Sequence, residues 1–358
     1  MDISKLPLLE VTIALCGSLF WILFGTVVAP KLGLVDRPSD RKKHGKDTPN
    51  SGGVAMLLGL IPALLLLDHP IPFQSRLVLA TLLTLVVGVW DDRSPLPVRT
   101  RFLAELAAGL IVTLGGGLTV LTLGNLVGLG EVNLGFLAVP FTVICIIGVI
   151  NALNMIDGLD GLAAGLSLVS FSALFYLAWE ANRVAEAEMI LLIIAVLIPF
   201  FLVNSRLFGQ SSARLFMGDA GSKMLGLSLA WFTVSLSQTL VLEDAEVIQP
   251  AFSASVALWL VALPLIDMFS SFLRRLVQKS NPFKPDANHL HHLLLQSGLS
   301  VNQTVLTLMG VGVGCALVGV KAEGMRLSEP LLFLGLLVLY AAYSTLSVRF
   351  WRRQRSLQ

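Results

Sequence analysis

The sequence predicts an all-α, polytopic integral membrane protein with about eleven transmembrane helices. Hydrophobic residues make up 55% of its 358 residues, and charged residues make up only 13%. The mean hydropathy is +0.81. A soluble globular protein carries about 25% charged residues, so the composition excludes that class. The deficit of charge extends along the whole chain, which also argues against a soluble domain on a single membrane anchor.

Apolar runs that are long enough for membrane helices recur along the chain, since a helix needs about 20 apolar residues to cross a bilayer. We expect helices near residues 8–30, 52–67, 77–90, 102–123, 134–153, 159–179, 187–204, 219–240, 252–273, 302–320 and 329–350. The first run lacks the basic segment and the small-residue cleavage site of a signal peptide. We therefore expect it to remain as the first membrane helix.

The positions of lysine and arginine predict the orientation in the membrane. Of the 25 such residues, 19 fall in one alternating set of loops and 5 in the other. Loops rich in lysine and arginine stay in the cytoplasm. The asymmetry predicts an external N-terminus and a cytoplasmic C-terminus for a single transmembrane domain over residues 1–358. The unusual motifs all fall in cytoplasmic loops, near residues 31–53, 91–101, 151–162, 204–222 and 274–300.

Two aspartates follow a long apolar run in the stretch NALNMIDGLDGLAAG, residues 151–165. If the helix continues through Asn154, Asp157 and Asp160 lie on one face, because residues three apart are neighbours on a helix. The glycines leave that face open to a ligand. Close packing of membrane helices also explains glycines, but it does not explain two carboxylates beside hydrocarbon.

Three more aspartates mark the ends of apolar runs. Asp91 and Asp92 end one run, and we expect them to have separate roles because adjacent helical residues do not share a face. Asp219 lies beside glycine at the start of another run. Taken alone, it is interpreted as a helix N-cap with a structural role. Phe216, three residues earlier, is either a core aromatic or a platform on which a base stacks.

The loop LVDRPSDRKKHGKDTPNSGG, residues 34–53, is strongly basic. Its cluster of Arg41, Lys42, Lys43, His44 and Lys46 suits either anionic lipid or a phosphate group. Gly52 and Gly53 open the next helix, and backbone amides at a helix start favour bound anions.

Three of the five histidines lie together as His289, His291 and His292. This spacing suggests a metal site, although zinc sites also need ligands at other spacings. Histidine can equally donate to phosphate oxygens. Asp267 lies near the inner end of its apolar run, where an ionisable residue is functional by default.

Acids, bases and phosphate-binding elements on one membrane side predict a metal-assisted phosphoryl transfer that involves a lipid. An oxygen-rich ligand set without cysteine selects Mg²⁺ or Mn²⁺. The alternative of a different class is an ion-coupled transporter. Transporters hold their acids near the bilayer midplane, whereas here the acids crowd one side.

The motifs DxPxxRKxH, DD, NxxNxxDGLDGLAAG, FMGDAGS and SNPFKPDxxHLHH occur in this order on consecutive cytoplasmic loops. The chain thereby resembles the polyprenyl-phosphate N-acetylhexosamine-1-phosphate transferase family from about residue 31 to 300. The resemblance implies transfer of a sugar 1-phosphate from a UDP-sugar to a polyprenyl phosphate with release of UMP and with Mg²⁺ as cofactor. It implies a bacterial inner-membrane protein whose site faces the cytoplasm. It implies no nucleic-acid partner, and it leaves a homodimer open.

The last loop separates two branches of the family. The sequence His-Leu-His-His at residues 289–292 resembles the branch that uses UDP-GlcNAc and undecaprenyl phosphate. The alternative branch, the phospho-N-acetylmuramoyl-pentapeptide transferases, has three consecutive histidines there. One departure is the segment between Asn204 and Phe216, which is longer here than in the muramoyl enzymes.

The resemblance also implies roles for individual residues. The expected metal ligands are Asp219, Asp91 and Asp92, of which the last two also orient the lipid phosphate. The nucleotide is held by Asn154, Asp157 and Asp160, and Phe216 stacks on uracil. The remaining expected substrate-binding residues are Lys42, His44, Lys46, Asn204, His289, His291 and His292.

Overall fold

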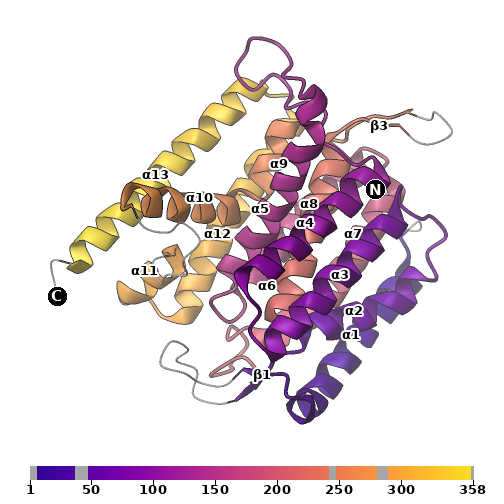
Figure 1. Cartoon of the computed structure of the whole chain (residues 1–358), viewed down its shortest axis with the longest axis vertical. Helices are drawn as coiled ribbons and strands as arrows, with labels where there is room; N and C mark the ends of the chain where they lie inside the picture. The colour runs from indigo at the N-terminus through magenta and orange to yellow at the C-terminus, as the bar shows by residue number, and fades with distance from the viewer. Residues whose placement is uncertain (1–5, 37–46, 242–246, 280–288, 356–358) are drawn as a thin grey trace.

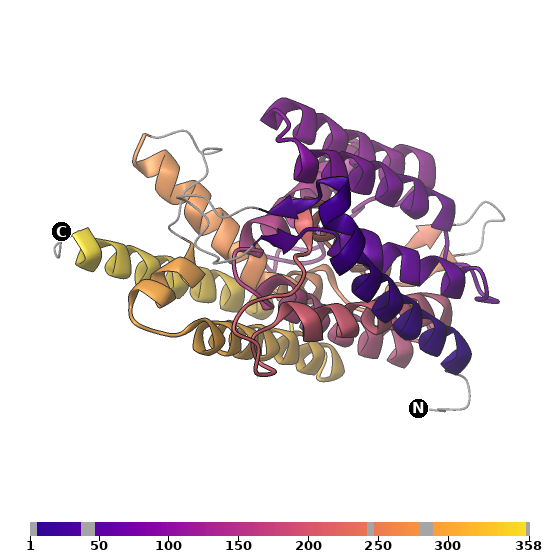
Figure 2. The same ribbon diagram turned by 90° about the horizontal axis from the view of Figure 1, so that it is seen from below.

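The computed structural model describes residues 6–36, 47–241, 247–279 and 289–355. Long helices run side by side in one bundle, and the first and last helices lie on opposite sides of it (Figure 1, Figure 2). The helices are α1 (Leu8–Val28), α2 (Gly52–Leu64), α3 (Gln74–Arg93), α4 (Val98–Gly116), α5 (Ala138–Ile156), α6 (Leu162–Glu180), α7 (Val184–Asn204), α8 (Gly218–Ser237), α9 (Ala254–Leu260), α10 (Ala262–Val277), α11 (Leu290–Gln296), α12 (Val301–Gly324) and α13 (Glu329–Arg355), with short 3-10 turns η2 (Ala29–Leu32) and η3 (Gly135–Leu137).

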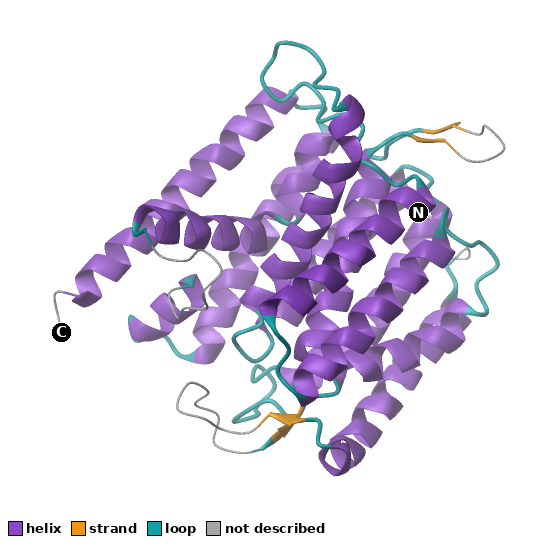
Figure 3. Cartoon of the chain, in the orientation of Figure 1, coloured by secondary structure: helices purple, strands orange, loops and turns teal. Residues whose placement is uncertain are grey.

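Strands form only two small antiparallel hairpins in the described residues, one at each end of the bundle (Figure 3). In the first hairpin β1 (Val35–Asp36) pairs with β2 (Thr48–Pro49). In the second, β3 (Leu240–Val241) pairs with β4 (Val247–Ile248). The predicted all-α class is therefore confirmed.

A helix lies at each of the eleven predicted segments, but fewer are long and apolar enough to cross a membrane alone. Within the described residues, seven helices meet that test, or eight if the pair α9 and α10 counts as one crossing. Helix α2 has 13 residues, which gives a length of about 20 Å against a hydrocarbon thickness of about 30 Å. The total of eleven crossings and the sidedness stay predictions.

Helix α8 lies at the centre of the bundle and is buried from Ala220 to Ser237. Small residues let its neighbours come close, as is typical of membrane helices. A Cβ atom on Gly53 of α2 would lie 2.3 Å from the amide nitrogen of Gly221. A Cβ on Gly88 of α3 would lie 2.4 Å from the Cα of Ala220. These contacts hold the start of α8 between the start of α2 and the last turns of α3.

The predicted continuous helix at 252–273 is wrong, because α9 and α10 meet at an angle of 82°. Pro264 has no amide hydrogen to donate to the Leu260 carbonyl one turn earlier. The hydroxyl of Ser170 on α6 donates to that carbonyl instead, at 2.7 Å. The break turns α10 across the other helices, so that it carries Asp267 into the interior of the protein (Figure 1).

Candidate active site

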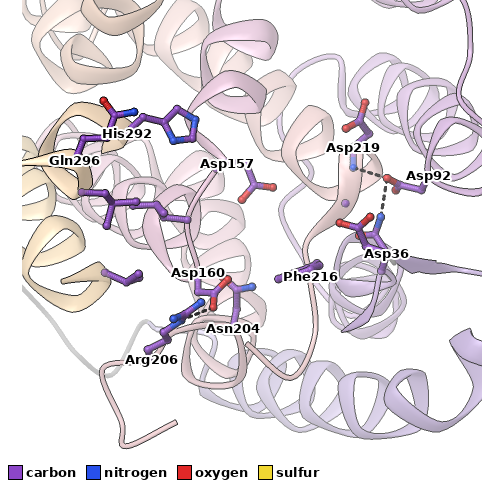
Figure 4. Close-up of a pocket in the computed structure, with 16 residues that line it drawn as sticks. Asp36, Asp92, Asp157, Asp160, Asn204, Arg206, Phe216, Asp219, His292 and Gln296 are labelled. Carbon is purple, nitrogen blue, oxygen red and sulfur yellow. Dashed lines mark hydrogen bonds and ion pairs between the residues drawn. The ribbon is translucent and has the colours of Figure 1, made fainter. Parts of the chain in front are cut away.

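A cavity of about 850 Å³ opens at the end of the bundle that carries β1 and β2 (Figure 1, Figure 4). This volume lies within the usual range for a small-molecule site. Seven predicted residues line it: Asp92, Asp157, Asp160, Asn204, Phe216, Asp219 and His292. These seven come from four of the five predicted loops, and Asp36 and Asn50 add the loop near 31–53.

Asp92 joins the end of α3 to the start of α8. Its carboxylate accepts hydrogen bonds from the backbone amides of Asp219 (2.9 Å) and Ala220 (3.3 Å) and from the side-chain amide of Asn50 (2.9 Å). Gly218 makes this approach possible, since a Cβ there would lie 2.4 Å from Asp92 Oδ2. A carboxylate stabilises helix-start amides in this way. The interpretation of Asp219 as the N-cap is wrong, because its own amide is one of those capped.

Neighbouring side chains fix the orientation of Asp219, whose own side chain is still 29% exposed. Asn154 donates to its Oδ1 at 3.2 Å. The ammonium group of Lys223, one helical turn later, lies 3.2 Å from its Oδ2, and the guanidinium of Arg101 lies 3.9 Å from the same atom. Asp219 is thus fixed in orientation while its carboxylate reaches the cavity.

Asp91 lies behind this carboxylate and does not line the cavity. It accepts hydrogen bonds from the Leu96 amide (2.7 Å) and from Arg101 (3.2 Å), and Lys223 lies 3.8 Å away. The two adjacent aspartates therefore have different partners, as the sequence predicts. Direct contact between Asp91 and a ligand stays a prediction.

The segment 157–161 is a loop, so the prediction that Asp157 and Asp160 share a helix face is wrong. Helix α5 ends at Ile156. Gly161 has a φ of +86°, a backbone conformation that glycine adopts more readily than other residues. The carboxylate of Asp160 accepts from Arg206 Nε at 2.6 Å and from the Ala213 amide at 3.0 Å. The loop is thereby fastened to the segment after α7.

Asn204, the last residue of α7, also holds the loop 157–161 in place. It is 4% exposed; its Oδ1 accepts from the Gly161 amide at 2.7 Å, and its Nδ2 donates to the Leu215 carbonyl at 2.8 Å. Because both ends of the side-chain amide have protein partners, Asn204 shapes the cavity wall. Direct contact between Asn204 and a substrate stays a prediction.

Burial, together with the negative charges of Asp219, Asp92 and Asp160, raises the pKa of Asp157 to about 7. The carboxyl group lies between these acids in the cavity (Figure 4). Among the described residues that line the cavity, five aspartates face one arginine and one histidine. A bound cation would relieve this repulsion.

The three histidines have different surroundings. His292 lines the cavity. His291 is 1% exposed and presses on the loop, because a Cβ on Gly158 would lie 2.4 Å from its Nε2. Burial lowers the pKa of His291 to about 3, so the ring is neutral. His289 bonds to Asp267 at 2.7 Å. No group of three histidine, cysteine or acidic side chains among the described residues is arranged to hold a metal ion.

The basic cluster at 41–46, including Lys42, His44 and Lys46, lies outside the described residues. The expectation that Gly52 and Gly53 bind an anion is wrong. Their amides donate to the carbonyls of Phe216 and Met217, each at 3.0 Å. These glycines instead bring α2 close to the start of α8.

Four lining residues with polar side chains were missed by sequence reasoning: Asp36, Asn50, Arg206 and Gln296. Asp36 begins the DxPxxRKxH motif, so a signal for it was present. Arg206 counts in the sequence only toward the positive charge of its loop. Asn50 and Phe216 form a bridge between neighbouring segments, which places the Phe216 ring at the cavity.

Comparisons with known proteins assign this chain to a family. The sequence matches the profile of glycosyl transferase family 4 over residues 75–237. A Yersinia pestis protein named undecaprenyl-phosphate alpha-N-acetylglucosaminyl 1-phosphate transferase is 34% identical over 343 residues, which cover 95% of this chain and 91% of the relative. The chain therefore belongs to glycosyl transferase family 4, and the predicted resemblance is confirmed.

Other relatives have the same name as the Yersinia pestis protein. The Pasteurella multocida protein is 34% identical over 350 residues, which cover 97% of this chain and 95% of the relative. The Salmonella typhi protein is 32% identical over 349 residues, which cover 97% and 92%. Together with the apolar helices, these matches show a multi-pass membrane protein.

Proposed function

We propose that this chain transfers N-acetylglucosamine 1-phosphate from UDP-GlcNAc to undecaprenyl phosphate. The products are undecaprenyl-diphospho-GlcNAc and UMP, and the reaction is the first membrane step of a cell-surface polysaccharide such as O-antigen, enterobacterial common antigen or a teichoic acid linkage. The main observation in support is that relatives named for this transferase align with 95% or more of the chain. The acid-lined cavity at one end of a membrane bundle supports it.

The nucleotide fits the part of the cavity that contains an aromatic ring and a guanidinium group. Phe216 offers a face on which uracil stacks. Arg206 uses its Nε toward Asp160, which leaves further N–H donors of the guanidinium for diphosphate oxygens. His292, which also lines the cavity, is assigned to donate to the sugar or the diphosphate.

The metal proposal rests on the donor set. The side chains that line the cavity present carboxylate and amide oxygens, and the Oδ1 of Asn50 is buried without a hydrogen-bond partner. Mg²⁺ prefers oxygen ligands and is usually bound by one or two carboxylates together with substrate phosphates. We assign Asp219 and Asp92 to hold Mg²⁺, or Mn²⁺, with Asp91 behind them. The ion would neutralise charge on the phosphates.

The acceptor needs positioning more than deprotonation. A phosphate monoester is largely ionised at pH 7, so the acids need not act as general bases. The polyprenyl tail stays in the bilayer, and the cavity at the bundle end lets its phosphate meet a soluble nucleotide. The distribution of lysine and arginine supports a cytoplasmic face of the inner membrane for this meeting.

The test offers purified protein radiolabelled UDP-GlcNAc and undecaprenyl phosphate with Mg²⁺, followed by extraction into butanol. A labelled lipid is expected, and none from the matched Asp219→Asn variant. A parallel reaction with UDP-MurNAc-pentapeptide separates the two family branches. Failure to form lipid product from any UDP-N-acetylhexosamine would contradict the proposal. Light scattering in detergent tests the separate prediction of a homodimer.

A further inference from the structure

A buried polar cluster joins the last membrane helix to the histidine segment. Asp267 on α10 is 3% exposed, and its carboxylate has three partners. Its Oδ2 lies 2.7 Å from Nδ1 of His289. Its Oδ1 accepts from the backbone amide of Leu290 at 3.2 Å and from the hydroxyl of Tyr343 on α13. An ionised carboxylate only accepts hydrogen bonds, so Nδ1 of His289 carries the proton.

We infer that Asp267 and Tyr343 are positioning residues, which hold His289 in its Nδ1-protonated form and dock the segment 289–292 against the loop 157–161. This inference rests on the proposed function, since it assumes that the histidine segment serves the transferase site. It makes the C-terminal helix α13 a support of that site.

Helix α11 needs this support, because it has only seven residues and an isolated helix of that length is unstable in water. Asp267 supplies an acceptor for the amide of Leu290, the first residue of α11. A second contact fixes α13 against α10, where the Ser344 hydroxyl donates to Ser270 at 3.2 Å. The carboxylate therefore has a fixed location relative to both helices.

A chain of ring contacts leads from this cluster to the cavity. The rings of His289 and His291 are nearly parallel, with centroids 5.8 Å apart. The rings of His291 and His292 have centroids 4.1 Å apart. His291 presses on Gly158, and His292 lines the cavity. A rotation of His289 would displace both neighbours, so its orientation matters for the wall that meets substrate.

Asp267→Asn is the main test, because it keeps the size of the side chain, removes its negative charge and replaces one acceptor oxygen by an NH2 donor. Buried partners of a functional histidine typically change activity by about 10- to 100-fold when they are replaced. We expect a fall of that size in kcat, with a change in KM for UDP-GlcNAc below about threefold. Tyr343→Phe should give a smaller fall in kcat. Tyr340→Phe, on the same helix, is the matched control and should leave kcat unchanged.

A double-mutant cycle with His289→Gln separates positioning from a general structural effect. If Asp267 acts through His289, the double variant is no slower than His289→Gln alone. Losses that multiply would overturn the inference. If Asp267→Asn does not fold, the same cycle is run with Tyr343→Phe.

Nitrogen-15 NMR of histidine-labelled protein reads the tautomer without turnover, and the His289→Gln variant assigns the signal. We expect a protonated Nδ1 in the parent protein and a protonated Nε2 in Asp267→Asn, since the carboxylate fixes the tautomer. An unchanged tautomer in the variant would overturn the inference. This readout holds even if the protein proves to use another donor, so the two failures are distinguishable.

Discussion

The carboxylate of Asp92 accepts a hydrogen bond from the backbone amide of Asp219 at 2.9 Å, which ties the end of α3 to the start of α8. Replacing Asp92 by Ala removes the cap from α8, which should lower the free energy of unfolding by about 1 kcal/mol. Thermal unfolding in detergent measures the loss. The exposed Asp68→Ala variant is the control, and equal melting temperatures for the two variants would contradict the capping role.

Asp219→Asn should lower kcat by about 100-fold, a size typical of lost electrostatic stabilisation at a reacting phosphate or oxyanion. Its amide can still accept from Asn154, so the variant should fold. Unfolding curves check the fold, and the lipid assay checks the rate. Near-normal turnover at saturating Mg²⁺ would rule out the proposed ligand role.

Lys223 neutralises a buried group of acids. Its ammonium group lies within 4.0 Å of carboxylate oxygens of Asp219, Asp91 and Glu105 and is 5% exposed. Lys223→Met would remove the buried cation that these three carboxylates share, which costs about 3 kcal/mol or more. We expect a lower melting temperature, measured against Lys321→Met on the exposed face of α12. A melting temperature like that of the parent would show that the acids find other partners.

The raised pKa of Asp157 predicts a dependence of stability on pH. The group titrates near pH 7 in the folded protein and near pH 4 in an unfolded chain. Between these values the folded protein holds a proton that the unfolded chain has lost, so stability falls as the pH rises through this window. Denaturant unfolding in EDTA from pH 5 to 8 should show this slope in the parent and a weaker slope in Asp157→Asn. Identical slopes would refute the assignment.

Phe216→Ala should weaken binding of a UDP-sugar, since stacking of a base on an aromatic ring contributes about 1–3 kcal/mol. The dissociation constant should therefore rise by about fivefold or more, as measured by calorimetry. Phe136→Ala, at an exposed ring outside the cavity, is the matched control. Unchanged affinity would show that the Phe216 ring only packs against the protein.

The membrane class and four of the five acids that line the cavity could be predicted because charged residues are scarce in this chain. An acid at the end of an apolar run must be hydrated, paired or bound to a cation, so Asp92, Asp157 and Asp219 were visible as site candidates. Their meeting in one cavity follows from the loops that carry them.

The partners of these residues could not be predicted. The sequence places Asp219 at a helix start, but the cap comes from Asp92, which is 127 positions away in the chain. The amides of Gly52 and Gly53 suit an anion or a carbonyl equally well, and only the tertiary fold supplies the carbonyls of Phe216 and Met217. These choices depend on contacts between distant segments, which a local pattern does not contain.

Because other parts of the protein enclose α8, its side chains do not need to be apolar enough to face lipid. From Ala220 onward no residue of this helix is left for hydrocarbon, so four serines and a lysine are tolerated where a lipid-facing helix would need leucine or valine. Because of these polar residues, α8 is not among the helices that are apolar enough to be recognised as membrane-spanning by hydropathy. In this protein, a helix whose start borders the candidate active site is thus among those that a search for apolar segments overlooks.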